Sequence, residues 1–245
     1  MAATKKWKDL DPNSRREFLS SKHRWILNAG IPNFSGIDWE ASSPFGSVGS
    51  AIVFDSEGKP LFDRPYYAEA PNVNCVVWGK DKNGVAKFAV ISQPRPHADD
   101  PEKPGDNHKP VVFGQIVMGF LEKLVGQDLL EKYENTHDGA IRETAEESGA
   151  QVILDIEHPA YPWHNPNPTF VKTWSDLLFI EADLKQIAEL KKDRNEPIFK
   201  AEYITAEELR QRIADGKDED GAVYRDCTSL STWFIFFCCH PELFI

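Results

Sequence analysis

One eight-residue segment near the middle of the chain, Arg142 to Gly149 (RETAEESG), constrains the fold more than any other part of the sequence. At about 100° per residue, an α-helix would place Glu143, Glu146 and Glu147 within one arc, with small or apolar residues opposite. Like charges three or four residues apart destabilise a helix by about 0.2–0.5 kcal/mol per pair, so this face favours a bound cation. Mg²⁺, which carboxylates commonly share with substrate phosphates, is the obvious candidate. A solvated acidic face is the ordinary alternative.

The same residues resemble a known family motif. Arg-Glu-x-x-Glu-Glu-x-Gly resembles the core of the Nudix box, G-x5-E-x7-R-E-U-x-E-E-x-G-U, in which U is aliphatic. Glu134 stands eight residues before Arg142, which is the spacing that the pattern requires. Thr144 and Ala150 depart from the pattern, because aliphatic residues are usual at those positions.

The glycine that opens the box has no clear counterpart. Asp128 stands at its position, and Gly126 and Gly119 are the nearby substitutes. The segment around Gly119 resembles the family's Pro-Ala-Gly-x-x-Glu loop, and in that register Glu122 rather than Glu134 approaches the metal. The sequence leaves both registers open.

The resemblance implies an α/β fold, an α/β/α sandwich around a mixed β-sheet. Residues 71–245 would form this domain, and residues 1–70 an N-terminal extension with a helix and a strand pair. The implied activity is hydrolysis of a nucleoside diphosphate linked to another moiety, with Mg²⁺ or alternatively Mn²⁺ as cofactor. The implied metal ligands are Glu143, Glu146, Glu147 and the backbone carbonyl of Met118 or Gly119. In the family, the arginine at the position of Arg142 orients the carboxylate at the position of Glu143. The implied catalytic residues are therefore Arg142, Glu143 and Glu147.

Candidate substrate-binding residues follow a predicted hairpin. Two β-branched runs, 73–78 and 86–92, flank an Asn-Gly turn. The next residues, Gln-Pro-Arg-Pro-His from Gln93, resemble the Gln-x-Arg-x-Pro segment of ADP-sugar pyrophosphatases. Gln93 and Arg95 are therefore candidates for binding a phosphate, which an arginine can grip with two hydrogen bonds. Ordering of its own loop is the alternative role for Arg95.

An aromatic, Pro-rich segment supplies a further candidate. Trp163 or Trp174 could stack on a nucleobase, although packing against the sheet is the alternative. Residues 181–184, Glu-Ala-Asp-Leu, resemble the strand ending of ADP-ribose enzymes, but the functional glutamate of the preceding loop has no counterpart here. ADP-ribose and another nucleotide sugar both stay open as substrates. A non-catalytic module that binds a nucleotide and regulates a partner stays open as the alternative function.

Composition narrows the classes of partner. A net charge of −11 without a dense Lys/Arg block argues against nucleic acid or an anionic membrane as ligand. The first residues contain no apolar signal-like run, and no stretch approaches the roughly 18 apolar residues of a membrane span. We therefore expect a cytoplasmic protein.

The N-terminal extension suggests a second copy of the chain as partner. A capping box at Ser14 and Glu17 predicts a short amphipathic helix, and residues 51–54 and 60–62 read as two short strands. These strands resemble those through which ADP-ribose-type Nudix enzymes form swapped homodimers. A cap on the same subunit is the alternative.

Local patterns predict the remaining elements. We expect a strand over 111–118 that enters a loop at Gly119, a helical turn or two within 121–133, helix caps within 136–138, and a helix end at Gly149. A late strand and helix should span 203–216, with a C-terminal helix from Asp226.

Overall fold

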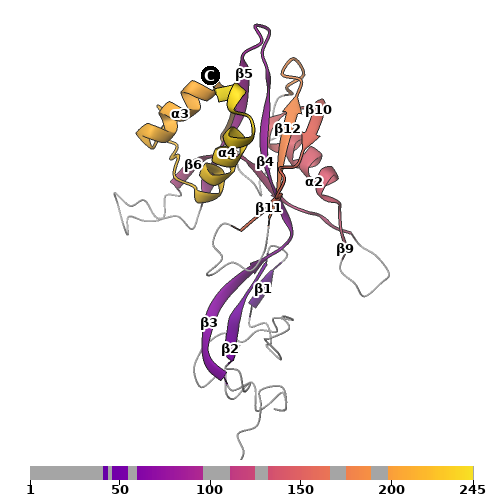
Figure 1. Cartoon of the computed structure of the whole chain (residues 1–245), viewed down its shortest axis with the longest axis vertical. Helices are drawn as coiled ribbons and strands as arrows, with labels where there is room; N and C mark the ends of the chain where they lie inside the picture. Colours follow the sequence, from indigo (N-terminus) through magenta and orange to yellow (C-terminus); the bar gives the residue numbers. More distant parts are fainter. Residues whose placement is uncertain are drawn as a thin grey trace, which may run out of the picture. The chain divides into compact units, whose positions relative to one another are not determined.

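The computed structural model describes residues 41–43, 46–54, 60–95, 111–124, 132–165, 175–188 and 198–244. The chain divides into two compact units, residues 1–71 with 165–174, and residues 72–164 with 175–245. In the first unit, β1 (Ala41–Ser43), β2 (Gly46–Phe54) and β3 (Pro60–Glu69) form an antiparallel sheet (Figure 1). The predicted strand pair is therefore present and longer than expected. The helix expected near Ser14 lies outside the described residues.

The second unit is built on a mixed sheet of eight strands. Its order is β10-β12-β4-β5-β13, with β11 beside β12, β7 beside β4 and β6 beside β5. The pairing of β12 with β4 is parallel and the others are antiparallel. The strands are β4 (Asn72–Lys80), β5 (Ala86–Arg95), β6 (Val111–Gln115), β7 (Val117–Phe120), β10 (Ile153–Glu157), β11 (Trp163–His164), β12 (Ser175–Ala182) and β13 (Lys200–Thr205).

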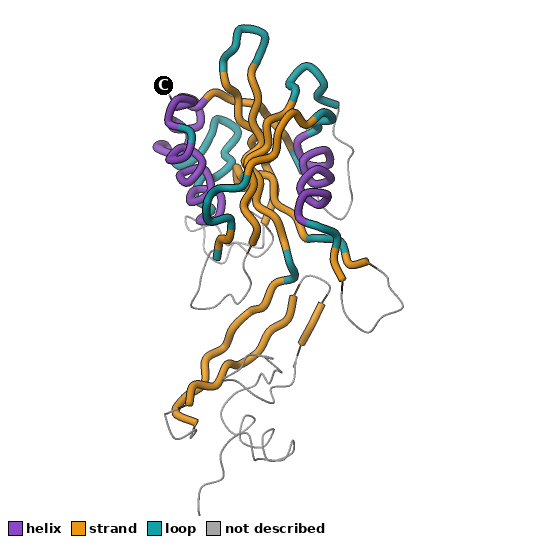
Figure 2. Tube along the Cα trace, turned by 45° about the vertical axis from the view of Figure 1, so that its right-hand side comes forward, coloured by secondary structure: helices purple, strands orange, loops and turns teal. Residues whose placement is uncertain are grey.

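Helices cover both faces of this sheet (Figure 2). On one face, α2 (Thr136–Glu143) continues into η2 (Thr144–Ser148), and on the other lie α3 (Ala206–Asp215), α4 (Cys227–Cys239) and η3 (Pro241–Phe244). Alternate residues of β4 supply the two cores, since Cys75 packs in the cluster with Ala140 of α2 and Val76 in the cluster with Trp233 of α4. The predicted α/β class with a mixed sheet is confirmed. No helix in the described residues combines the length and apolarity needed to cross a membrane.

The two strands of the central hairpin, β4 and β5, pair near their turn and separate farther from it. β4 and β5 pair only between residues 78–80 and 86–88, beyond which β7 pairs with the free part of β4 and β6 with that of β5. The chain changes strand at Ile116, whose amide donates to Ser229 Oγ at 3.2 Å. The prediction of one strand followed by a loop at Gly119 is wrong, because one straight strand cannot follow two diverging neighbours. Gly119 lies inside β7.

One further local prediction needs correction, and another falls largely outside the described residues. The ends of the segment predicted as helical form a small pairing of β8 (Lys123–Leu124) with β9 (Lys132–Tyr133), and residues 125–131 lie outside the described ranges. The helix cap is Asn135, whose side chain accepts the amide of Asp138 at 2.9 Å, so the predicted cap residues are already helical. Gly149 does end the helical segment, with φ of 76°.

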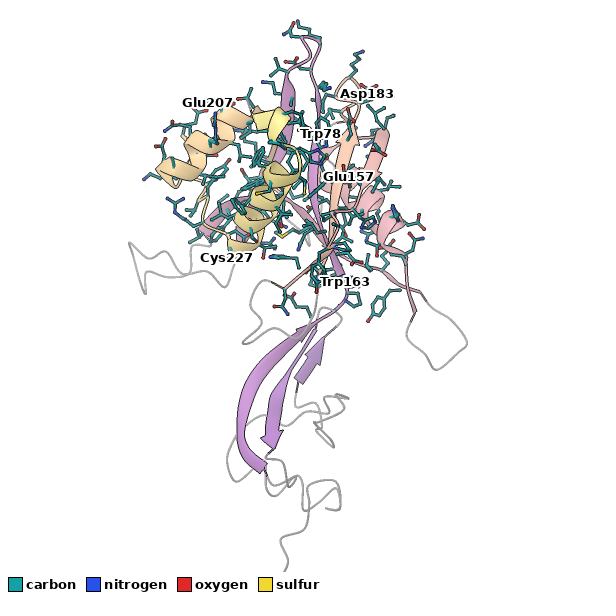
Figure 3. All side chains as sticks on the ribbon, viewed as in Figure 1. Trp78, Glu157, Trp163, Asp183, Glu207 and Cys227 are labelled. Atoms are coloured by element: carbon teal, nitrogen blue, oxygen red, sulfur yellow. The ribbon has the colours of Figure 1, made fainter. Side chains whose placement is uncertain are left out.

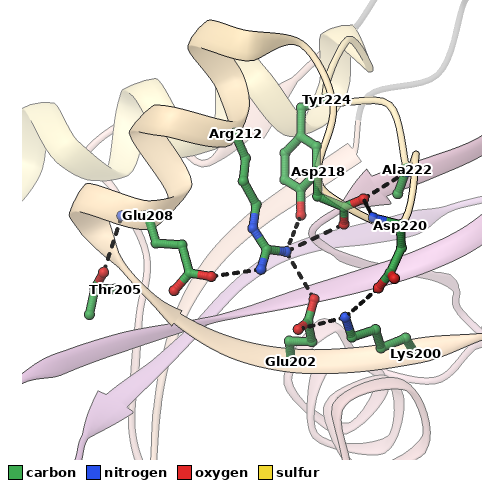
Figure 4. Close-up of polar contacts among 9 residues, drawn as sticks. All are labelled: Lys200, Glu202, Thr205, Glu208, Arg212, Asp218, Asp220, Ala222 and Tyr224. Carbon is green, nitrogen blue, oxygen red and sulfur yellow. Dashed lines mark hydrogen bonds and ion pairs between the residues drawn. The ribbon is translucent and has the colours of Figure 1, made fainter.

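A buried arginine ties the elements on the other face together (Figure 4). The guanidinium of Arg212 donates to Glu202 of β13 at 2.9 Å, Glu208 of α3 at 2.7 Å and the hydroxyl of Tyr224 at 2.9 Å. It also lies 3.4 Å from Asp218, whose side chain is buried in the loop after α3. Burial alone would lower the pKa of Arg212, but the bonds to Glu202 and Tyr224 raise it, so the group stays charged.

Replacing Arg212 with methionine should lower the free energy of unfolding by about 3 kcal/mol, because Glu202 and Asp218 lose their buried cation. Urea denaturation measures this loss. Arg210→Met, two residues along the same helix, removes an exposed pair with Glu207 and should cost less than about 0.5 kcal/mol. Equal losses in the two variants would contradict the role of Arg212.

Candidate functional site

Two buried carboxylates lie at the end of α2 and in η2, which pack on one face of the sheet. Glu143, the last residue of α2, is 5% exposed, and Glu147 in the π-helical turn η2 is 4% exposed. Four steps of an α-helix overshoot a full turn by about 40°. A π turn is wider and rotates less at each residue, which reduces this offset and directs both side chains to the sheet. Glu146 is left exposed.

Both carboxylates contact strand β7. The amide of Met118 donates to Glu147 Oε2 at 2.9 Å. The carboxylate of Glu143 lies against Gly119, where a Cβ atom would collide with it. The absence of a side chain at Gly119 therefore makes room for Glu143. Of the predicted metal-binding residues, the structure brings Glu143 and Glu147 to the same two-residue stretch of β7.

Arg142 connects the carboxylates around the helix. Its Nη1 donates to Glu143 Oε1 at 2.7 Å and to Glu146 Oε2 at 3.1 Å. Its Nη2 donates to Glu134 Oε1 at 2.6 Å and to the carbonyl of Phe120 at 2.9 Å. The bond to Glu143 is the contact that the predicted orienting role of Arg142 requires.

The two alternative glutamates occupy different environments. The side chain of Glu134 is 12% exposed and accepts the amide of Glu122 at 2.8 Å as well as the bond from Arg142. The side chain of Glu122 is 69% exposed and lies 3.9 Å from Arg142. Burial opposes ionisation of Glu134, but the hydrogen bonds from Arg142 and Glu122 outweigh it and hold its pKa below the ordinary value. Glu134 is thus the more buried of the two and packs beside Arg142.

The donor set suits a hard divalent cation. Four carboxylates lie within 3.9 Å of the guanidinium of Arg142, those of Glu122, Glu134, Glu143 and Glu146, and that of Glu143 is buried. Within the described ranges, no three His, Cys, Asp or Glu side chains are grouped as a ready metal site. Glu146 is exposed and accepts a hydrogen bond from Arg142. Mg²⁺ is usually held by one or two carboxylates together with substrate phosphates, so Glu143 and Glu147 fit this ion without a third protein carboxylate.

Cys75 lies beneath this cluster, which sequence reasoning did not anticipate. It is fully buried on β4, opposite Val117 of β7. Burial first, and then the charges of Glu143 and Glu147, raise the pKa of its thiol. The thiol therefore stays protonated at neutral pH. Only the alternation along β4 could have indicated which face it occupies.

Gln93 and Arg95 lie within β5, so the expectation that the strand ends before them is wrong. Pro94 is tolerated because the pairing of β5 with β13 ends at Ser92, so the backbone at Pro94 has a partner strand, β6, on one side only. Both side chains point to the same face as Ala89 and Ile91, which pack with α2, and they lie at the end of the sheet that also holds Gly119. Arg95 Nε donates to Gln115 Oε1 at 2.9 Å, a partner that the sequence did not reveal.

Trp163 is placed apart from these residues. It lies in β11, and β12 and β4 stand between that strand and β5. Trp163, labelled in Figure 3, is 54% exposed. Its ring meets that of Tyr161 edge to face, with the ring centroids 5.6 Å apart. About half of the surface of Trp163 is therefore exposed to solvent. Trp174 lies outside the described residues.

No protein-family model matches the chain, and a search of curated proteins found no significant match.

Glu134→Gln should change stability in a pH-dependent way. Because the folded pKa of Glu134 is depressed, its stabilising effect is present above the unfolded value of about 4.3 and is lost as the pH falls through the folded pKa. The difference in unfolding free energy between wild type and variant should therefore be largest near pH 7 and shrink below about pH 4.3. Urea denaturation across this pH range measures it.

Glu146→Gln is the matched control, because it removes the exposed partner of Arg142 and should cost about 0.5 kcal/mol at most. A loss of unfolding free energy in Glu134→Gln that does not vary with pH would contradict the stabilising effect of ionised Glu134.

Proposed function

We propose that this chain is a Nudix hydrolase that cleaves the diphosphate bond of a nucleoside diphosphate linked to another moiety. ADP-ribose or another nucleotide sugar is the proposed substrate class. One observation carries the proposal: Glu143 and Glu147 are buried together against Met118 and Gly119, with Arg142 bracing the first of them. Helices on both faces of a mixed sheet also agree with the α/β/α sandwich of that family.

The proposed chemistry divides between a cation and the chain's own side chains. A bound Mg²⁺ or Mn²⁺ would offset the charge of the diphosphate and activate a water for attack on phosphorus. Glu143 and Glu147 would hold the cation, with a backbone carbonyl at Met118 or Gly119 and, once released from Arg142, Glu146 as further donors. Arg142 keeps the carboxylate of Glu143 oriented through the 2.7 Å bond.

The proposed substrate contacts lie beyond this cluster. Arg95 binds a phosphate while Gln115 holds its Nε and leaves the rest of the guanidinium available for a bidentate contact. Gln93 lies next along the same face of β5. The exposed ring of Trp163 provides an apolar face on which a nucleobase could stack.

A second candidate function is a non-catalytic module that binds a nucleotide and regulates a partner. The observation in its favour is that Arg142 already contacts Glu134, Glu143 and Glu146, so the outer carboxylates are engaged with an arginine. Such a module would bind a nucleotide tightly in calorimetry without hydrolysing it.

We also propose that the N-terminal unit serves homodimer formation. Its support is the antiparallel sheet of β1, β2 and β3, which precedes Asn72 as the swapped strands precede the catalytic domain in ADP-ribose-type enzymes.

Dinucleotides and nucleotide sugars assayed with Mg²⁺ and with Mn²⁺ should reveal the reaction, with products identified by mass spectrometry. We expect AMP and ribose 5-phosphate from ADP-ribose. Glu147→Gln should lower kcat by about 100-fold or more, which is typical for loss of a group that stabilises developing charge.

Glu219→Gln is the control for that series, because it makes the same chemical change on an exposed loop of the other face. Metal-dependent turnover of none of these substrates would overturn the proposal. Tight nucleotide binding without turnover would favour the regulatory module instead.

Gly119→Ala should reduce activity about as strongly as Glu147→Gln, because the new methyl group must displace the carboxylate of Glu143. Steady-state kinetics measures the loss. Gly84→Ala is the control, since Gly84 has open space around it but a φ of 79°, so alanine there costs about 1 kcal/mol of stability without touching the site. Equal activity in the two alanine variants would contradict the steric role of Gly119.

A further inference from the structure

We propose that Tyr203 of β13 is a positioning residue that holds the π turn η2 and thereby sets the carboxylate pair Glu143 and Glu147 to receive a cation. This inference rests on the proposed function, because it assigns a purpose to the same site. Tyr203 itself touches neither carboxylate in any contact described above, so its effect must pass through the helix.

The contact that carries the inference joins residues 55 apart in sequence. The hydroxyl of Tyr203 donates to Ser148 Oγ at 3.0 Å and lies 3.3 Å from the carbonyl oxygen of Ser148. Ser148 Oγ in turn donates to the carbonyl of Thr144 at 2.6 Å. Thr144 and Ser148 are the first and last residues of η2, so this chain of hydrogen bonds spans the turn.

A π turn needs such outside support. Its backbone departs from the regular ladder of the α-helix, and π turns occur mostly as single turns at functional sites. The end of η2 is also held by Gly149, whose carbonyl accepts the amide of Ala188 at 2.8 Å. A Cβ atom at Gly149 would collide with the carbonyl of Ala188, and the φ of 76° there favours glycine.

The shape of the turn decides where the carboxylates lie. Glu147 immediately precedes Ser148, and its Oε2 accepts the amide of Met118 at 2.9 Å. Relaxation of η2 to α-helical geometry would restore an offset of about 40° between Glu143 and Glu147. The hydrogen bond donated by Tyr203, which lies in strand β13 of the sheet, opposes that relaxation.

Tyr203 is suited to act as a constant donor. Burial raises the pKa of its phenol to about 12, and the hydrogen bond to Ser148 lowers it less. The phenol therefore keeps its proton at neutral and moderately alkaline pH. Its ring packs with the core on the α2 face, so removal of the oxygen alone leaves that packing in place.

The test is Tyr203→Phe in the full chain. Mn²⁺ binding, followed by electron paramagnetic resonance of the free ion, should weaken about 5- to 10-fold, the usual size for one buried hydrogen bond. Amide hydrogen exchange over residues 144–150 should accelerate by a similar factor without metal. Tyr224→Phe is the matched control: it removes a hydroxyl bonded to Arg212 on the other face and should change neither measurement.

A double-mutant cycle shows whether Tyr203 acts through Ser148. Ser148→Ala should weaken Mn²⁺ binding by itself, and the double variant should bind no more weakly than Ser148→Ala alone. Additive losses would contradict an effect of Tyr203 through Ser148, because they would mean that the two groups act separately.

The outcomes separate this inference from the proposed function. If the wild type binds Mn²⁺ and Tyr203→Phe binds it equally, with unchanged exchange over η2, the inference is wrong and the proposed function stands. If the wild type binds no Mn²⁺, the proposed metal chemistry is wrong, and the role of Tyr203 in serving it falls with it.

Discussion

Burial of two like charges side by side is the constraint on which the site depends. Isolated buried carboxylates are costly unless hydrogen bonds and opposite charges compensate them. Here Arg142 donates to Glu143, the amide of Met118 donates to Glu147, and Gly119 supplies the space. The remaining acidic surplus is the physical reason to propose a divalent cation and, with it, a phosphate substrate for a chain of net charge −11.

The opened hairpin makes this arrangement available. Because β4 and β5 separate beyond their turn, β7 can present its backbone to η2 on one face. On the other face, Ser229 and Val223 accept the amides of Ile116 and Gly114 at the change of strand. The two helical layers are thus joined through the same short segment, residues 114–118.

The residues proposed to bind substrate lie farther apart than those proposed to bind the metal. Gln115 holds Arg95 on the face of η2, whereas Trp163 stands beyond β12 and β4. A ligand that used both would have to extend across several strands, which suits a molecule with two moieties joined by a diphosphate. This reach is a reason to favour nucleotide sugars over smaller phosphates within the proposed function.

The sequence by itself determined what depends on neighbours along the chain: the acidic helix, its end at Gly149, and the Asn-Gly hairpin. Spacing and backbone conformation are local properties, so residue types reveal them. Tertiary structure decided the π turn, the choice of Glu134 over Glu122 beside Arg142, and the position of Gly119 inside a strand. It also supplied Tyr203, because the bond to Ser148 joins residues far apart in the chain, and a pattern of neighbours carries no record of such contacts.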